Sequence, residues 1–400
     1  MMHELRLYVG RLLWAGIVVL GIAHTTPEHV AVAQGQPEPV PTFELDSSWP
    51  KPLPNNWMFG PVWGVAVDSK DHVWVIHNPK GGWPIGDNTV AEIKAAGKVP
   101  APAVVEFDAE GNVVQGWGGH DGPGYNWVQV SNASYPYGTP AEHAIFVDYK
   151  DNVWVAGNGH LALKFTPAGK FLLQIGELWK TNGSNDTRLL GNPTDLAVDP
   201  RTNEVYIADG YVNHRVIVFD ADTGKYKRHW GAYGLKPFDG PIAKTDANPD
   251  DNLVPDSSDS RVPGNWPLPQ WLFPVHGVRI AKDGLVYVCD RQHSRVQVFQ
   301  TSGKFVKEVR ISASGLGSAS GVAFSADPQQ RYLYVAGGKT WILRRSDLQI
   351  LGSVESSGNH YIAVDSKGNL YTNGSRSADG VRTPLKYVLK GVGTTTSRGR

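Results

Sequence analysis

Apolar and polar residues alternate in short segments along most of this chain, in a phrase that recurs six times. Each copy has an alternating apolar segment, a turn rich in Asp, Lys, Gly and Asn, and a second alternating segment that carries aromatic residues. A two-residue period on both sides of a turn predicts a β-hairpin. The copies begin at Trp63, His143, Thr194, His276, Ser320 and His360.

Some copies continue into a third and a fourth strand, as in the segments that begin at Arg215 and Tyr226. Four antiparallel strands form one blade of a β-propeller, and bare blades repeat about every 40–50 residues. We therefore predict an all-β, six-bladed propeller over residues 42–393. A strand near residues 42–46 should pair with one near residues 385–389, because this closure removes the open sheet edge.

The longer intervals between copies contain insertions. Inserts of a repeat protein gather on one face, which is often its binding face. Several aromatic residues in these inserts suit ligand stacking, although packing alone also accounts for them. The inserts cover about residues 78–103, 118–142, 176–193 and 232–272, and the aromatic residues are Trp83, Trp127, Tyr135, Tyr137, Trp266 and Trp271.

Residues 1–33 match a secretory signal peptide. Two arginines precede an apolar run from Leu12 to Ala23, and residues 31–33 read Ala-Val-Ala, a small-x-small cleavage site. The run is too short for a comfortable membrane span, so an uncleaved anchor is the alternative interpretation. Residues 34–41 are predicted to form a linker and residues 394–400 a disordered tail.

The composition limits which partners and which cellular compartment the sequence favours. Lys+Arg and Asp+Glu both total 38, which argues against a nucleic-acid partner or a polybasic membrane-surface protein. Gly 45 and Pro 28 fit a β-rich chain with many turns. The single cysteine, Cys289, excludes an intramolecular disulfide and a multi-Cys metal site. We expect an exported, bacterial periplasmic or secreted monomer, with no stable membrane span after signal removal.

The residue that precedes each inner strand holds the same place in every blade, at the mouth of the central channel. Histidine occupies this place in blades two, four and six, as His143, His276 and His360. Alternate blades are related by about 120°, so the three imidazoles should converge on the axis. Three protein ligands with an open fourth position are typical of a catalytic zinc site. We predict a metal site here; hydrogen-bonding histidines in a wet channel are the alternative.

The turns after the second strands of blades three and four carry further polar residues. An aspartate and an arginine flank each turn, a pattern typical of structural locks in repeat proteins. Tyr211 and Arg291 lie in these turns at positions that the lock does not require. Beside a metal, a phenol can act as acid or base and a guanidinium can anchor a carboxylate. We predict Tyr211 as catalytic and Arg291 as substrate-binding, with surface turn residues as the alternative.

The repeats resemble NHL repeats, and residues 55–375 resemble the catalytic core of peptidyl-α-hydroxyglycine α-amidating lyases. The similarity is strongest over residues 193–219, followed by residues 273–280 and 286–299. The resemblance implies a zinc-dependent lyase that cleaves the C–N bond of a carbinolamide.

The family's functional residues match positions already singled out in this chain. Its three zinc histidines, from alternate blades, match His143, His276 and His360. Its catalytic tyrosine matches Tyr211, and one of its substrate-carboxylate arginines matches Arg291. The resemblance therefore implies the same division of roles that the ring and the turns suggest.

The chain departs from the family at three positions. Asn78 stands in place of a second arginine, Tyr361 in place of an acidic calcium ligand, and Val212 in place of a disulfide cysteine. Calcium is therefore doubtful as a cofactor. The small-molecule or peptide substrate stays open, as does a related lyase or metal-dependent hydrolase.

Two other functions remain alternatives. A non-catalytic secreted propeller could bind a protein, peptide or glycan on its loop-rich face, because one fold hosts many functions. A sugar-lactone hydrolase is the least favoured, because its axial ligands are carboxylates and amides. Metal content separates the lyase from the binding propeller.

Overall fold

The computed structural model describes most of the chain within one compact unit, residues 38–400. The predicted signal peptide and most of the predicted linker and tail lie outside the described residues, as do Trp83, Tyr135, Tyr137 and Trp266. The described residues are 39–79, 89–119, 125, 127, 142–157, 159–237, 239, 271, 274–311, 319–356, 360–374 and 383–394.

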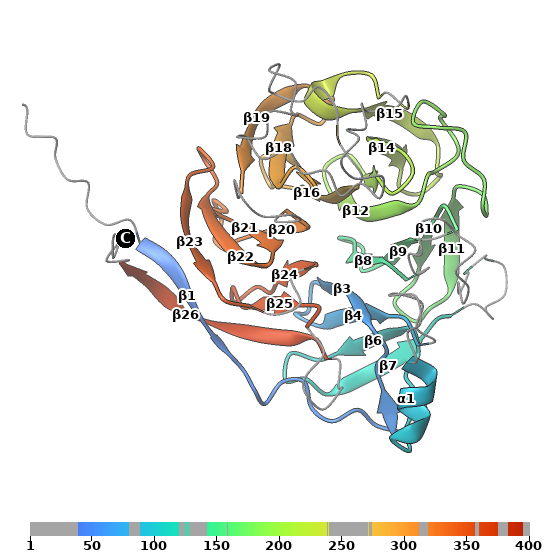
Figure 1. Ribbon diagram of the computed structural model, residues 1–400, viewed down its shortest axis with the longest axis vertical. Helices are drawn as coiled ribbons and strands as arrows, with labels where there is room; N and C mark the ends of the chain where they lie inside the picture. The colour runs from blue at the N-terminus through green and yellow to red at the C-terminus, as the bar shows by residue number, and fades with distance from the viewer. Residues whose placement is uncertain are drawn as a thin grey trace, which may run out of the picture. The chain divides into compact units, whose positions relative to one another are not determined.

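In this part of the chain, six four-stranded antiparallel sheets surround one axis (Figure 1). The predicted all-β, six-bladed propeller is confirmed. The inner strands, which contact one another around the ring, are β3 (Val62–Val67), β8 (Ala144–Val147), β12 (Pro193–Asp199), β16 (Val275–Ile280), β20 (Gly321–Phe324) and β24 (Ile362–Val364).

The other strands follow outward in each blade. The second strands are β4 (Val73–His77), β9 (Val153–Gly157), β13 (Glu204–Asp209), β17 (Val286–Asp290), β21 (Tyr332–Gly337) and β25 (Leu370–Thr372). The third strands are β6 (Val104–Phe107), β10 (Leu161–Phe165), β14 (Arg215–Asp220), β18 (Arg295–Phe299), β22 (Lys339–Arg344) and β26 (Leu385–Thr394). The outer strands are β7 (Val113–Trp117), β11 (Phe171–Ile175), β15 (Tyr226–Trp230), β19 (Phe305–Arg310), β23 (Ile350–Val354) and β1 (Pro39–Leu45).

The sixth blade combines the two ends of the described chain. Strand β1 pairs antiparallel with β26, with Phe43 opposite Leu389 and Leu45 opposite Tyr387. This is the closure that the sequence predicts. It covers the edge that the third strand of the last blade would otherwise leave open, because β26 pairs with β25 at its start and with β1 from Tyr387 onward.

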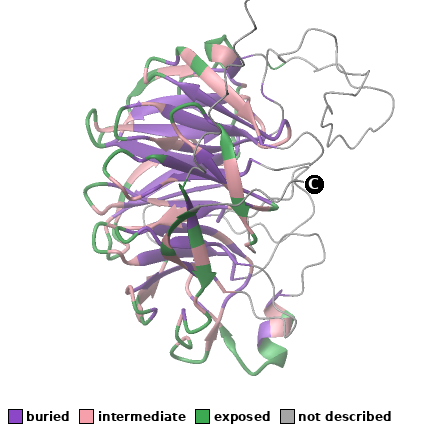
Figure 2. Ribbon diagram, turned by 90° about the vertical axis from the view of Figure 1, so that its left-hand side faces the viewer, coloured by how far each residue is buried: buried purple, intermediate pink, exposed green. Residues whose placement is uncertain are grey.

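In the recurring sequence phrase, an aspartate at the first turn of a blade holds that turn by side-chain hydrogen bonds. In blade one, Asp68 accepts the backbone N–H of Lys70 at 2.8 Å and the indole N–H of Trp74 at 3.0 Å. In blade two, Asp148 accepts the indole N–H of Trp154, also at 3.0 Å. Both indoles are buried in the core. In Figure 2 the buried residues run along the strands, whereas exposed residues gather in the turns.

One short α-helix and one 3₁₀ turn, η1 (Ala232–Gly234), accompany the strands in the described residues. Helix α1 (Thr89–Ala95) lies between the second and third strands of blade one, with Ile93 buried. It precedes β5 (Val99–Pro100), which pairs in parallel with β2 (Trp57–Met58). Over the described residues, no helix has the length and apolar character that crossing a membrane requires.

Candidate metal centre

Three histidines from alternate blades meet near the propeller axis. His143 directly precedes β8, His276 lies in β16, and His360 lies two residues before β24. One ring nitrogen of each lies within 4.8 Å of the others. The ring centroids are 5.3 Å (His143–His276), 4.8 Å (His143–His360) and 4.5 Å (His276–His360) apart. We call these three residues the axial histidines.

Local irregularities in the inner strands aim the ring residues at the axis. In β16 the register shifts between Val275 and Gly277, so His276 is an extra residue in the pairing with β17. Such a bulge re-aims the side chain of the added residue. Gly277 lets the next inner strand come close, since a Cβ there would lie 2.9 Å from the Ser320 carbonyl oxygen. In β3 the register shifts in the same way between Val62 and Gly64, so Trp63 has no partner residue in the pairing with β4.

The blades that lack histidine hold the axial histidines in place. His143 Nδ1 lies 2.8 Å from the Thr194 carbonyl oxygen, and His276 Nδ1 lies 2.5 Å from that of Ser320. His360 Nδ1 lies 3.1 Å from the carbonyl oxygen of Trp63. Each acceptor is the ring residue of the next blade. Because a carbonyl only accepts, each imidazole carries its proton on Nδ1 and keeps a lone pair on Nε2.

The Nε2 lone pairs face into one small space. His276 Nε2 lies 2.9 Å from His360 Nε2, and His143 Nε2 accepts a hydrogen bond from the Tyr211 hydroxyl at 2.9 Å. Burial is the main cause that lowers the pKa of His143 to about 3 and holds the pKa of the other two well below the ordinary value. Neutral imidazoles with converging lone pairs fit a divalent cation such as zinc.

Tyr211 lies beside the axial histidines. It follows β13, its backbone N–H donates to the Asn192 carbonyl oxygen at 3.2 Å, and its ring meets that of His143 edge-on at 5.0 Å. Burial raises the pKa of Tyr211, and the nearby Arg291 opposes that shift. The phenol therefore has both a contact with the centre and a cation that favours its ionised form.

Arg291 is the cation of this site. It follows β17, and its positive charge contributes to lowering the pKa of each axial histidine. Its Nε atom is buried and has no hydrogen-bond partner. A buried guanidinium donor without a partner suits an anionic ligand, because such a group costs free energy when left unsatisfied.

Two aromatic residues that sequence analysis did not place in the site complete it. Trp63 stacks on His143, with ring centroids 5.9 Å apart and an interplanar angle of 24°. It also meets His360 edge-on, with ring centroids 5.4 Å apart. Tyr361 stacks on His276 at 5.2 Å, and its hydroxyl lies 3.0 Å from His143 Nδ1. The sequence offers one clue to both residues. Trp63 is itself the ring residue of blade one, and Tyr361 directly follows the ring residue His360.

Tyr361 and Asn78 are both buried at positions where the chain departs from the family. The Tyr361 hydroxyl donates to the Thr194 carbonyl oxygen. Asn78 follows β4, and its backbone N–H donates to the Pro61 carbonyl oxygen at 2.9 Å. A phenol therefore stands where the family resemblance implies a carboxylate, and it contacts the axial histidines directly.

The aspartate–arginine pairs after the second strands are buried ion pairs. Arg215 Nε lies 2.9 Å from Asp209, and Arg295 Nε lies 2.8 Å from Asp290. All four side chains are fully buried. They lock the turns that carry Tyr211 and Arg291, as the sequence suggests.

Other residues singled out from the sequence belong to the core. Trp127 and Trp271 are buried and donate their indole N–H to Glu142 at 2.7 Å and Gln297 at 2.8 Å. Cys289 is buried, and burial raises the pKa of its thiol. These residues therefore serve packing.

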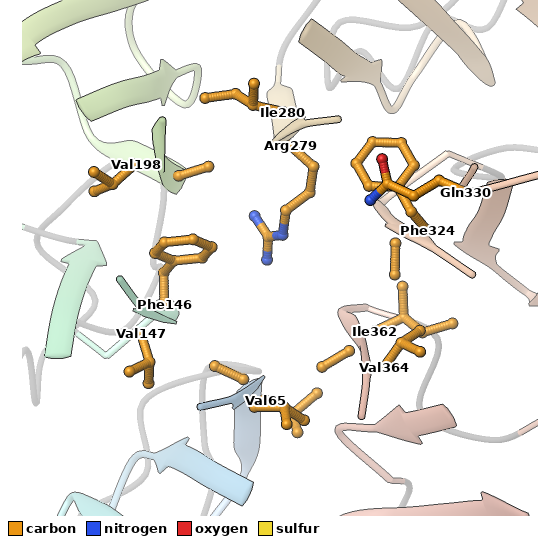
Figure 3. Close-up of a pocket in the computed structure, with 15 residues that line it drawn as sticks. Val65, Phe146, Val147, Val198, Arg279, Ile280, Phe324, Gln330, Ile362 and Val364 are labelled. Atoms are coloured by element: carbon orange, nitrogen blue, oxygen red, sulfur yellow. The ribbon is translucent and has the colours of Figure 1, made fainter. Parts of the chain in front are cut away.

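A cavity of about 190 Å³ lies along the inner strands and is walled largely by apolar side chains (Figure 3). The guanidinium of Arg279 points into it. Arg279 Nη1 pairs with Asp195 at 2.5 Å, and the guanidinium lies 5.4 Å from the Phe146 ring centroid. Because its charge is already paired, this arginine offers less to an anion than Arg291 does.

The NHL repeat family model matches residues 190–219 and 275–299. These two segments of the chain are thus similar to NHL repeats. The matched segments lie in blades three and four and contain His276, Tyr211 and Arg291.

Curated relatives match this chain in sequence. The chain is 25% identical over 348 residues to peptidyl-glycine alpha-amidating monooxygenase A of Xenopus laevis, covering 82% of this chain and 32% of that protein. It is 31% identical over 195 residues to peptidyl-alpha-hydroxyglycine alpha-amidating lyase 2 of Drosophila melanogaster, covering 47% of this chain and 42% of that protein. The NHL-repeat chain is thus homologous to amidating enzymes, and it spans about a third of the length of the first of these.

A solved streptogramin B lyase structure superposes with a TM-score of 0.46 at 9% identity, covering 87% of this chain and 98% of that one. At that level of likeness it adds no argument about function.

Proposed function

We propose that this NHL-repeat propeller is an exported, monomeric, metal-dependent lyase that cleaves the C–N bond of a carbinolamide. The observation that carries the proposal is the geometry of the axial histidines. Their Nε2 atoms converge, their Nδ1 atoms are tied to main-chain carbonyls, and Tyr211 contacts the same centre. Homology to amidating enzymes supports this assignment.

His143, His276 and His360 would hold the metal, with zinc as the expected ion. A zinc ion held by three neutral histidines acts as a Lewis acid and makes a nearby hydroxyl group more acidic. The main-chain acceptors of Thr194 and Ser320 fix the ring orientation that this role requires.

Arg291 and Tyr211 act on the substrate. The Arg291 guanidinium binds a substrate carboxylate, which suits its buried and unpartnered Nε. The Tyr211 Oη atom, as phenolate, accepts the proton of the carbinolamide hydroxyl. The C–O bond becomes a carbonyl while the C–N bond breaks, and the departing nitrogen takes up the proton that Tyr211 accepted. The products are an amide and an aldehyde.

The decisive experiment measures metal content and turnover together. Purified mature protein should contain about one zinc or similar ion per chain, and it should convert an N-acyl-α-hydroxyglycine to the amide and glyoxylate. A variant with all three axial histidines changed to alanine should lose both properties. A wild-type protein without stoichiometric metal, even after zinc is supplied, would overturn the lyase and leave a binding propeller.

A further inference from the structure

Trp63 is the ring residue of blade one, and it differs from its counterparts in blades three and five. Thr194 and Ser320 present their carbonyl oxygens to axial histidines, and Trp63 does the same toward His360. Only Trp63 of these three adds a large side chain, which contacts the rings of His143 and His360. Its indole therefore forms a wall of the candidate metal centre.

The indole N–H of Trp63 is buried and has no hydrogen-bond partner. Within the described residues, Trp49, Trp230 and Trp341 share this property. Of these four indoles, Trp63 is the one whose ring contacts axial histidines. A buried donor without a partner requires an explanation, and a donor beside a reaction centre can be satisfied by the substrate.

Cleavage of a carbinolamide places charge on a second atom besides the hydroxyl oxygen. As the C–N bond breaks, the electron pair moves to the amide nitrogen and is delocalised onto the acyl oxygen of the departing amide. A fixed N–H donor to that oxygen stabilises the transition state more than the ground state. Arg291 is already assigned to the carboxylate, so a second donor is needed for the acyl oxygen.

We propose that the Trp63 indole N–H donates a hydrogen bond to the acyl oxygen of the departing amide. This role rests on the proposed lyase function and assigns Trp63 as a catalytic residue. The electron pair of the O–H bond forms the new C=O bond, the C–N electron pair leaves with the amide, and Tyr211 Oη takes the hydroxyl proton and passes it to the nitrogen to complete the neutral amide.

The test replaces Trp63 by phenylalanine, which keeps an aromatic wall and removes the N–H. Trp341→Phe is the matched control, because Trp341 is also partly buried with an unpartnered N–H and lies in the third strand of blade five. Two measurements on both variants do not depend on turnover. Elemental analysis gives the metal content, and calorimetry gives the affinity for N-acetylglycine, which lacks the hydroxyl group and does not react. Rates are compared for N-acetyl- and N-trifluoroacetyl-α-hydroxyglycine, since the second amide is the better leaving group.

Trp63→Phe should keep its metal, lower kcat for the N-acetyl substrate by about 10–100-fold, and lower it less for the N-trifluoroacetyl substrate. N-acetylglycine binding should weaken by only about 3-fold, because the ground-state acyl oxygen carries less charge. Trp341→Phe should match the wild type throughout.

Equal losses for the two substrates, or no loss, would overturn the role of Trp63 while the lyase stands. A wild-type protein that holds metal but neither cleaves nor binds these compounds would overturn the lyase, and this role with it. Metal loss in Trp63→Phe alone would show that the indole supports the histidines instead and would also overturn the role.

Discussion

Two groups of potential metal ligands in the described residues bring their ligand atoms within 4.8 Å: the axial histidines, and Asp68 with His72 and Glu106. In the second group the carboxylates are hydrogen-bonded. Asp68 accepts backbone and indole N–H groups, His72 Nδ1 lies 2.6 Å from Glu106, and Gln115 donates to the other Glu106 oxygen. The carboxylate oxygens therefore already have donors.

In the axial histidines the Nδ1 atoms are tied to the main chain. The Nε2 atoms of His276 and His360 face each other with no donor between them, whereas His143 Nε2 accepts the Tyr211 hydroxyl. Proximity is thus the same in the two groups, and the number of uncommitted lone pairs distinguishes them. This comparison predicts which group binds metal, and the following changes test it in order of expected effect.

Removing one axial ligand should have the largest effect. His276→Ala leaves two imidazoles, so we expect the stoichiometric metal to be lost and turnover to fall below detection. Elemental analysis of the purified variant, with circular dichroism to show folding, provides the measurement. A variant that retained metal with wild-type affinity would place the ion elsewhere.

Tyr211→Phe removes the proposed proton acceptor and leaves the axial histidines in place. We expect kcat to fall by about 10²–10⁴-fold with unchanged metal content, because general acid–base groups contribute about this much. Steady-state kinetics and elemental analysis of the same preparation separate the two roles. Full activity in this variant would remove Tyr211 from the mechanism.

Tyr361→Phe tests the support beneath His143. The phenol hydroxyl lies 3.0 Å from His143 Nδ1 and also donates to Thr194, so its loss should loosen the ring orientation. We expect about a 10-fold weaker metal affinity, at the low end of what outer-shell partners contribute. Competition with a fluorescent chelator measures this, and an unchanged dissociation constant would show that Thr194 alone suffices.

His77 offers a contrasting histidine, because both of its ring nitrogens have partners. Its Nδ1 accepts the Gly60 N–H at 3.1 Å, and its Nε2 lies 2.8 Å from the Pro102 carbonyl oxygen. Burial is the main cause that lowers the pKa of His77 from 6.5 to about 4. The unfolded chain therefore binds a proton between pH 6.5 and 4 that the folded protein does not.

The stability that His77 contributes is present above pH 6.5 and is lost as the pH falls toward 4. In metal-free protein this residue should add a slope of about 1.4 kcal/mol per pH unit to the free energy of unfolding in that range. Urea titrations of the wild type and His77→Gln between pH 7 and 4.5 isolate the contribution. Equal slopes for the two proteins would contradict the neutral, buried state of His77.

The sequence predicts the propeller and the meeting of the three axial histidines, because both depend on a repeat. Six hairpin phrases predict six blades, and equivalent positions in alternate blades bring His143, His276 and His360 together. The pairing of β1 with β26 also follows from the repeat, because the sixth blade needs one more strand. These features depend on which residues are equivalent between blades, and the recurring phrase shows this directly.

What the sequence does not predict depends on contacts between blades. The pairing of Nδ1 atoms with carbonyls of the next blade requires the bulge at His276 and the close approach at Gly277. The place of Trp63 and Tyr361 in the site follows from the same packing. Neither is marked by a residue type associated with metal sites, since both are aromatic residues in a chain rich in them.

The smallest expected effect belongs to the second ligand group. His72→Ala removes the partner of Glu106 Oε1, while Gln115 keeps the other oxygen hydrogen-bonded. We expect unchanged metal content and turnover, and a loss of about 1 kcal/mol in the free energy of unfolding, the usual contribution of one hydrogen bond. Elemental analysis and urea unfolding, run beside His276→Ala, complete the comparison. Metal loss in His72→Ala would mean that proximity of ligand atoms, and not the number of free lone pairs, decides where this propeller binds its ion.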